Sequence, residues 1–195
     1  MAHTSYIELA ERLNDQLWAR RGNDNGGKIY PWVNSYDERL HGVQIACCGK
    51  IEETATNISG RKMAKAVRDA YKTICERIGL EPELPKRDDY CFRASYGEWH
   101  FIDGNGKLLL VWVDPLDNLC TEYDEEDKPV KEPTYDEVLA ECEDYIETGN
   151  MYFEFAEDEE DEREGYHGVR REAWERLPEN AAEIMARTLY QSYYA

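Results

Sequence analysis

The stretch EWHFIDGNGKLLLVWV, residues 98–113, decides the fold class of this chain. Two runs rich in apolar and aromatic residues, 98–102 and 107–113, flank the turn sequence DGNG at 103–106. Because Asp, Asn and Gly tolerate the backbone angles of tight turns, this pattern predicts a hairpin of antiparallel strands. With a further strand at 90–95, it favours an antiparallel sheet over the alternating order of a doubly wound fold.

Helices are predicted where apolar residues recur every three or four positions. The clearest helix runs from Gly60 to Ile78, with Ser59 as its N-cap and Gly79 at its end. Other helices are expected at 6–20, 135–147 and 169–176, and after Asn180. Other strands are expected at 28–33, where Pro31 indicates a sheet edge, at 43–47 and at Tyr152–Phe155.

These elements predict one α+β domain of residues 1–195, in which four to five helices pack against an antiparallel sheet of about four to six strands. The composition shifts near 114–134, where a boundary between sub-domains is the alternative.

The negative charge lies entirely in the second half of the chain. Of the 42 acidic and 23 basic side chains, residues 1–100 hold 15 of each, so residues 101–195 carry the whole net charge of −19. The segment 114–164 alone has 22 acids and 3 bases. Such a field attracts basic partners and disfavours direct binding to nucleic acid or to an anionic membrane.

Several function classes find no support in the sequence. No apolar run approaches the roughly 20 residues of a membrane helix, and no signal segment is visible, which predicts a soluble cytoplasmic protein. The six cysteines are expected to be reduced structural thiols. No cofactor, metal or catalytic motif stands out. Asp114 and Asp117 are the best candidates for catalytic carboxylates, and His100 is expected to be a packed histidine rather than a general base. Residues 103–114 begin like a calcium loop, but Lys107 and Leu108 break that pattern.

The predicted helix at 134–148 sets a length scale for the acidic segment. It carries six acids over roughly 22 Å, or about one charge per 3.7 Å, near the roughly 3.4 Å per charge of one DNA strand. A folded scaffold with this surface predicts a binding protein that occupies the basic, nucleic-acid-binding groove of a partner. The residues predicted to bind that partner are Asp124, Glu125, Glu126, Asp127, Asp136, Glu137, Glu141, Asp144, Glu157, Asp158, Glu159, Glu160 and Asp161. Aromatic side chains that could anchor the contact are Tyr123, Tyr135, Tyr145, Tyr152 and Phe153.

In size and in the charge pattern of 114–164, the chain resembles the small acidic inhibitors that phages and plasmids use against restriction enzymes and CRISPR effectors. The resemblance implies a DNA-mimicking inhibitor with neither catalysis nor a cofactor. It covers the charge pattern alone, and no functional residues are transferred from it.

Two other classes remain open. One is an enzyme or a metal- or ligand-binding protein whose site is assembled from distant carboxylates. The other is an assembly protein, in which a basic ridge on the helix 60–78 pairs with the acidic helix of another copy. The ridge consists of Arg61, Lys65, Arg68 and Lys72. It is also the surface that could contact phosphate, or simply a solvated helix face.

Overall fold

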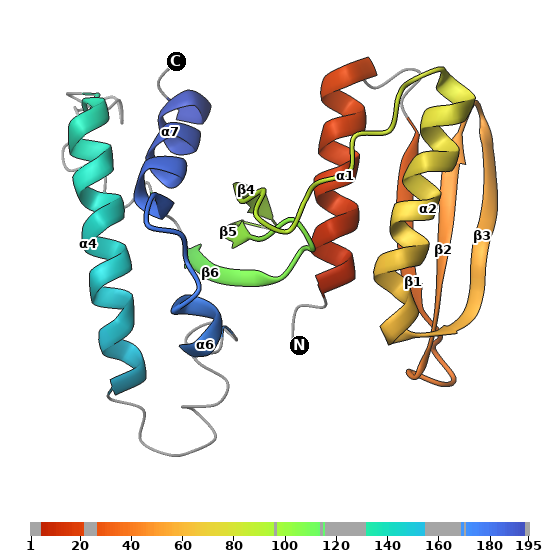
Figure 1. Ribbon diagram of the computed structural model, residues 1–195, viewed down its shortest axis with the longest axis horizontal. Helices are drawn as coiled ribbons and strands as arrows, with labels where there is room; N and C mark the ends of the chain where they lie inside the picture. The colour runs from red at the N-terminus through yellow and green to blue at the C-terminus, as the bar shows by residue number, and fades with distance from the viewer. Residues whose placement is uncertain are drawn as a thin grey trace, which may run out of the picture. The chain divides into compact units, whose positions relative to one another are not determined.

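The structure of the chain is a computed structural model (Figure 1). It describes residues 5–21, 27–95, 97–113, 115, 132–154, 169 and 171–193, and of 149–154 the backbone alone. The described residues divide into two compact units, an N-terminal unit of 5–89 with 104–107 and a C-terminal unit of 90–103 with 108–193. No helix in these described ranges is both long and apolar enough to cross a membrane.

The N-terminal unit has the element order helix, three strands, helix. Its elements are α1 (Ser5–Arg21), β1 (Lys28–Val33), β2 (Leu40–Cys47), β3 (Lys50–Ser59) and α2 (Gly60–Ile78). The strands form an antiparallel sheet in the order β1-β2-β3. Both helices pack against this sheet and against each other (Figure 1).

Alternation along β2 explains the packing, because successive side chains of a strand point to opposite faces. Val43, Ile45 and Cys47 are buried with the apolar stripe of α2, which includes Met63 and Ile74. The predicted bounds of α2 are confirmed, and Gly79 ends the helix with a left-handed φ of 69°.

Strand β1 is confirmed at Lys28–Val33, and as predicted it lies at the sheet edge, since it pairs with β2 alone. The buried side chain of Asn14 in α1 covers part of that edge. Its Nδ2 donates to the carbonyl oxygen of Ile29 at 3.0 Å, and its Oδ1 accepts from the amide of Ile29 at 2.8 Å.

Strand β3 was absent from the sequence prediction. Most of its side chains are exposed or half-buried, so it lacks the clear alternation of a half-buried strand. The two-residue turn Cys48-Gly49 fixes it against β2, because both residues have positive φ, 52° and 74°, as a type I′ hairpin turn requires.

The C-terminal unit contains β4 (Cys91–Ser95), β5 (Glu98–Ile102), β6 (Leu108–Val113), α4 (Tyr135–Glu154), α6 (Arg171–Trp174) and α7 (Ala181–Tyr193). The hairpin predicted at 98–113 is confirmed, with β5 paired antiparallel to β6 from Glu98 opposite Val113 to Ile102 opposite Leu108. The core includes Phe101, Leu110 and Trp112 from the sheet, packed with apolar residues of α4, α6 and α7. In Figure 1, α4 and α7 lie side by side.

The α+β class is thus shown, with five helices among the described residues, but the single sheet of four to six strands is not confirmed. The described strands form two three-stranded sheets, because each run of three consecutive strands pairs only within itself and buries its own core. The single domain stays a prediction, and the alternative boundary at 114–134 lies almost wholly outside the described residues.

Two local predictions in the second half were wrong. The helix expected to stop at Glu147 continues through Gly149 to Glu154, so residues 152–154 of the predicted strand are helical. A single interior glycine costs a helix only about 1 kcal/mol, which packing of α4 against α7 can offset. The helix expected at 169–176 is also shorter, because α6 spans Arg171–Trp174.

Candidate functional site

A capping box of Thr134 and Glu137 closes the N-terminus of α4. The Glu137 carboxylate accepts hydrogen bonds from the amide and the hydroxyl of Thr134, at 2.7 and 3.0 Å, and the Glu137 amide donates to the Thr134 hydroxyl at 3.3 Å. Such a cap satisfies amides that an isolated helix end leaves unpaired. Glu137 therefore stabilises the helix, and its carboxylate is already engaged in hydrogen bonds with Thr134.

One face of α4 is an acidic stripe, which we define as Asp136, Glu143, Asp144 and Glu147. All four side chains are exposed, whereas Val138 and Cys142 on the opposite face are fully buried. The stripe covers 12 residues of the helix, about 18 Å at a rise of about 1.5 Å per residue. Its four carboxylates therefore give about one charge per 4.5 Å, sparser than the about 3.7 Å per charge expected from all six acids of the helix.

The other predicted site residues lie at the margin of the stripe or outside the described residues. Glu141 in α4 is half-buried beside Cys142 and so lies at the margin of the stripe. The residues outside the described part of the chain are Asp124–Asp127 and Glu157–Asp161. Asp114 and Asp117, the candidate catalytic carboxylates, also lie outside it.

Two of the predicted aromatic anchors are instead packing residues. The ring of Tyr145 stacks on Trp112 with centroids 4.2 Å apart, and its hydroxyl donates to the carbonyl oxygen of Val111 at 2.6 Å. Tyr135 is half-buried and makes an edge contact with the ring of Tyr190. Aromatic spacing in a sequence does not distinguish a surface anchor from a ring that secures a helix to its sheet.

Two residues of the basic ridge of α2 make contacts within the N-terminal unit. Arg68 donates to the carbonyl oxygens of Pro85 and Gly104, at 3.3 and 3.0 Å, and to Oδ1 of Asn105 at 2.8 Å. Lys65 forms an ion pair with Asp69 on the same helix. Arg68 thus ties the segment 104–107 to α2.

In the C-terminal unit, the buried side chains of His100 and Asp103 each lie beside a partly exposed ionisable partner. His100 is fully buried and its Nε2 lies 3.0 Å from Oε2 of Glu98, as expected for a packed histidine. Asp103 is buried, with Arg176 3.6 Å away. Within the described ranges, no group of three or more His, Cys, Asp or Glu side chains is placed to hold a metal ion.

The cysteine predictions agree with the described thiols. Cys75 and Cys142 are buried among apolar residues. Burial raises the pKa of the Cys142 thiol to about 12, so this group stays protonated and unreactive at neutral pH.

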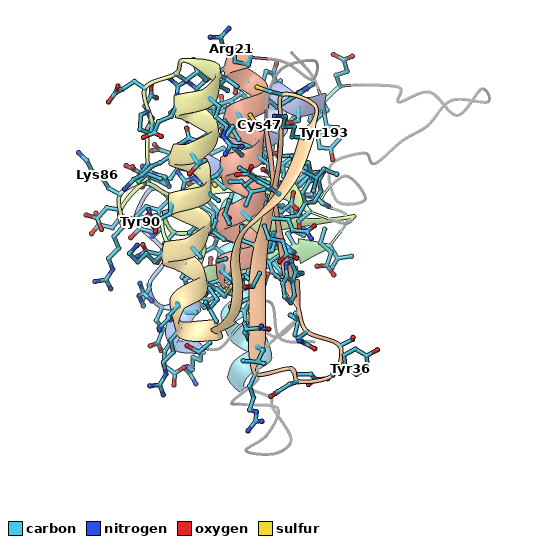
Figure 2. All side chains as sticks on the ribbon, turned by 90° about the vertical axis from the view of Figure 1, so that its right-hand side faces the viewer. Arg21, Tyr36, Cys47, Lys86, Tyr90 and Tyr193 are labelled. Atoms are coloured by element: carbon cyan, nitrogen blue, oxygen red, sulfur yellow. The ribbon has the colours of Figure 1, made fainter. Side chains whose placement is uncertain are left out.

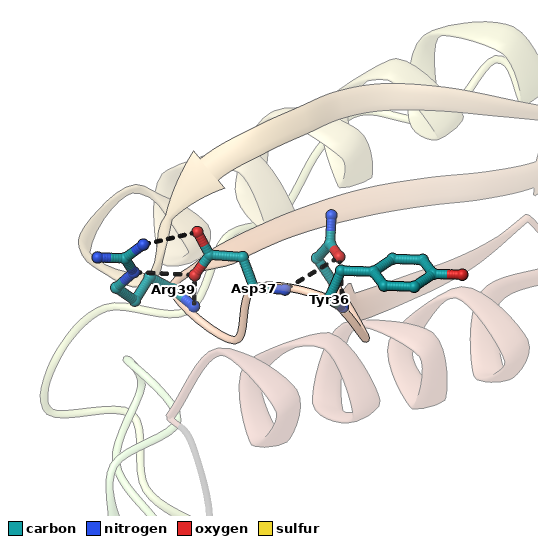
Figure 3. A network of polar contacts seen from close by, with 4 residues as sticks. Tyr36, Asp37 and Arg39 are labelled. Atoms are coloured by element: carbon teal, nitrogen blue, oxygen red, sulfur yellow. Dashed lines mark hydrogen bonds and ion pairs between the residues drawn. The ribbon is translucent and has the colours of Figure 1, made fainter.

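The sequence prediction missed a rigid loop between β1 and β2 (Figure 3). Oδ1 of Asn34 accepts from the amides of Tyr36 and Asp37, and the guanidinium of Arg39 donates to both carboxylate oxygens of Asp37 at 2.8 and 2.9 Å. Hydrogen bonding from Arg39 lowers the pKa of Asp37 to about 2. The loop presents Tyr36, which is 99% exposed, away from the strands (Figure 2). The sequence signal was Asn34, a residue that favours such turns.

The β1–β2 loop and the first turn of α2 lie at the same end of the sheet, because the start of β2 pairs with the end of β3. Leu40 pairs with Ser59 across the sheet, and a Cβ added to Gly60 would lie 3.3 Å from Nε2 of His41. The phosphate end, as we call this surface, comprises Tyr36, Arg39, Arg61, Lys62 and Lys65.

Comparison with known proteins identifies no relative: no family model, curated protein or solved structure matches the chain.

Proposed function

We propose that this protein is a cytoplasmic binding protein whose acidic stripe engages the basic, nucleic-acid-binding surface of another protein and blocks it. The proposal is supported by four exposed carboxylates on one face of a helix whose opposite face is anchored in a core. Because α4 is already folded, binding of the partner would not carry the entropic cost of ordering this helix.

The experiment neutralises the stripe without changing its shape. Wild-type protein and the variant Glu143→Gln, Asp144→Asn, Glu147→Gln are immobilised, and bound proteins of the source cell are eluted with a salt gradient. The matched control is Glu76→Gln, Glu81→Gln, Asp88→Asn, which removes the same charge from exposed sites of the N-terminal unit.

A basic partner should be retained by wild type and by the control, and lost or eluted at lower salt from the stripe variant. Retention of the same partner by all three proteins at the same salt would refute the role of the stripe.

The phosphate end favours a second candidate function, binding of double-stranded RNA by the N-terminal unit. Its four exposed basic residues are Arg39 in the loop and Arg61, Lys62 and Lys65 in the first two turns of α2, and the acids nearest to them in sequence are Asp37, Glu38 and Asp69. Residues 5–89 and 104–107, which make up the N-terminal unit and include residues 22–26, contain 14 acidic and 15 basic side chains. The N-terminal unit therefore lacks the negative excess of the whole chain.

RNA is favoured over DNA by the form of the loop. A-form RNA has a wide, shallow minor groove that is recognised by shape, by phosphates and by 2′-hydroxyls. A preformed loop with an exposed tyrosine suits such a groove. The basic side chains of α2 would then contact phosphates beside the groove.

The probes are an RNA duplex of about 20 base pairs, a DNA duplex of the same sequence and one RNA strand. RNA duplex should bind best, and Lys62→Gln with Lys65→Gln should weaken binding and flatten its salt dependence. The control, Lys72→Gln with Lys86→Gln, removes two exposed bases outside the phosphate end and should have a smaller effect. Equal losses in both double variants, or no binding of the RNA duplex, would exclude this function.

A further inference from the structure

Two adjacent cysteines occupy the tip of the β2–β3 hairpin. Cys47 is the last residue of β2, and Cys48 is the first residue of the two-residue turn before Lys50. Their sulfur atoms lie 3.5 Å apart. This tip is at the opposite end of β2 from the loop that carries Tyr36 (Figure 2).

The two thiols have different surroundings. Cys47 is 3% exposed and packs in the core of the N-terminal unit, while Cys48 is exposed. Burial raises the pKa of Cys47 to about 11, although the positive charge of Arg77 opposes that rise. Arg77 is itself held beside the turn by an ion pair with Glu52 at 2.5 Å.

We infer that Cys47 and Cys48 form a redox-modification site, in which a hydroperoxide converts the neighbouring thiols to a vicinal disulfide. Cys48 is the residue that meets the oxidant, because it is accessible to solvent. Cys47 is the resolving residue, because its sulfur already lies beside that of Cys48 and is shielded from the oxidant.

The reaction has two steps with hydrogen peroxide as the oxidant. The Cys48 thiolate attacks one peroxide oxygen, the O–O bond breaks, and the departing hydroxide takes up a proton to form water, which leaves a sulfenic acid. The Cys47 sulfur then attacks the Cys48 sulfur, the S–O bond breaks, and the hydroxide leaves as a second water with the proton of Cys47. In total, two thiols and one hydrogen peroxide give one disulfide and two waters.

The disulfide should be easy to reduce. Consecutive Cα atoms are about 3.8 Å apart across a trans peptide, below the roughly 4.4–6.8 Å of ordinary disulfides. Strained and exposed disulfides are the labile ones, so a small dithiol should restore the two thiols. Oxidation also draws the sulfur of Cys47 out of the core, which should lower the melting temperature of the N-terminal unit.

The test uses the tryptic peptide Leu40–Lys50, which contains Cys47 and Cys48 and no other cysteine. The full-length protein is treated with hydrogen peroxide, remaining thiols are alkylated with N-ethylmaleimide under denaturing conditions, and the digest is analysed without reductant. The expected product is a peptide two hydrogens lighter than the dithiol form and free of maleimide, which regains two reactive thiols after dithiothreitol.

Two variants separate the roles of the sulfurs. Cys48→Ser keeps the buried thiol and the fold, and its peptide should carry one maleimide on Cys47 after peroxide. Cys47→Ser removes the resolving thiol, so Cys48 should accumulate oxygen as sulfinic acid. Cys142, buried with a raised pKa, is the internal control and should remain alkylatable in all samples.

Three results would overturn the inference: two maleimides on the wild-type peptide after peroxide, oxygen addition in place of hydrogen loss, or a disulfide from Cys48 to a cysteine outside the peptide. None of these results depends on the acidic stripe or on the phosphate end.

Discussion

Replacing Asn14 by alanine should destabilise the N-terminal unit more than its small size suggests. The buried Asn14 amide makes two hydrogen bonds to the backbone of Ile29, one in each direction, at 3.0 and 2.8 Å. Alanine would leave the N–H and the C=O of Ile29 without these partners at the edge of β1.

The magnitude follows from the two backbone groups. Each buried group left unsatisfied costs about 1–3 kcal/mol, and water reaching the strand edge would reduce that cost, so the expected loss is about 2–4 kcal/mol in the free energy of unfolding. The edge strand would also expose backbone groups that favour pairing with another chain, so the variant should associate more readily.

The assay is urea denaturation followed by circular dichroism, with hydrogen exchange of peptides from β1 to localise the effect. The matched control is Asp15→Ala, the next residue of α1, whose side chain is exposed and whose loss should cost less than about 1 kcal/mol. A loss below about 1 kcal/mol for Asn14→Ala, or equal losses in the two variants, would refute the reasoning.

Three further predictions concern other contacts of the N-terminal unit. Gly106→Ala should lower the free energy of unfolding by about 3 kcal/mol or more in urea denaturation, because φ is +79° and a Cβ would lie 2.2 Å from the backbone oxygen of Ser5. Gly79→Ala, at a φ of +69° but with open space around the added Cβ, should lower it by about 1 kcal/mol. Arg68→Ala should cost about 1–3 kcal/mol, with little rescue by Arg68→Lys, while Lys72→Ala on the same ridge should stay within about 0.5 kcal/mol. In an NMR titration, the carboxyl of Asp37 should have a pKa of about 2 in the wild type and a pKa nearer the ordinary value in Arg39→Ala. Because the pKa is lowered in the folded state, the contribution of this group to stability is present above about pH 4 and is lost as the pH falls toward 2. A normal Asp37 titration in the wild type, equal costs for Gly106 and Gly79, or full rescue by Arg68→Lys would each contradict the corresponding contact.

The sequence predicted the elements that carry strong local signals. Helix α2 was found from Ser59 to Gly79 because its caps and its apolar stripe agree, and the 98–113 hairpin because its turn residues and its alternation agree. Strand β3 was missed because its side chains are mostly exposed and the turn before it begins with a cysteine. The end of α4 was misplaced because a single glycine was taken as a stop, although packing can outweigh it.

Sheet number and site geometry required tertiary information. Strand signals do not say which strands pair, so six candidate strands are compatible with one sheet or with two. The sequence places six acids on α4 but does not show which of them share an exposed face, since Glu137 caps the helix and Glu141 is half-buried. The phosphate end could not be predicted from the sequence either. Tyr36 and Lys62 are brought to the same end of the sheet by the pairing of β2 with β3, which no local pattern encodes.

The central claim is that the acidic stripe takes the place of nucleic acid on a basic partner. The most direct test measures the dissociation constant of the captured partner for wild type and for the variant Glu143→Gln, Asp144→Asn, Glu147→Gln, at low and high salt and with competing nucleic acid. We predict binding that weakens with salt, a loss of about 3- to 100-fold in the variant, and displacement by the partner's own nucleic acid. Binding that is independent of salt, unchanged in the variant, or simultaneous with that of nucleic acid would contradict the account.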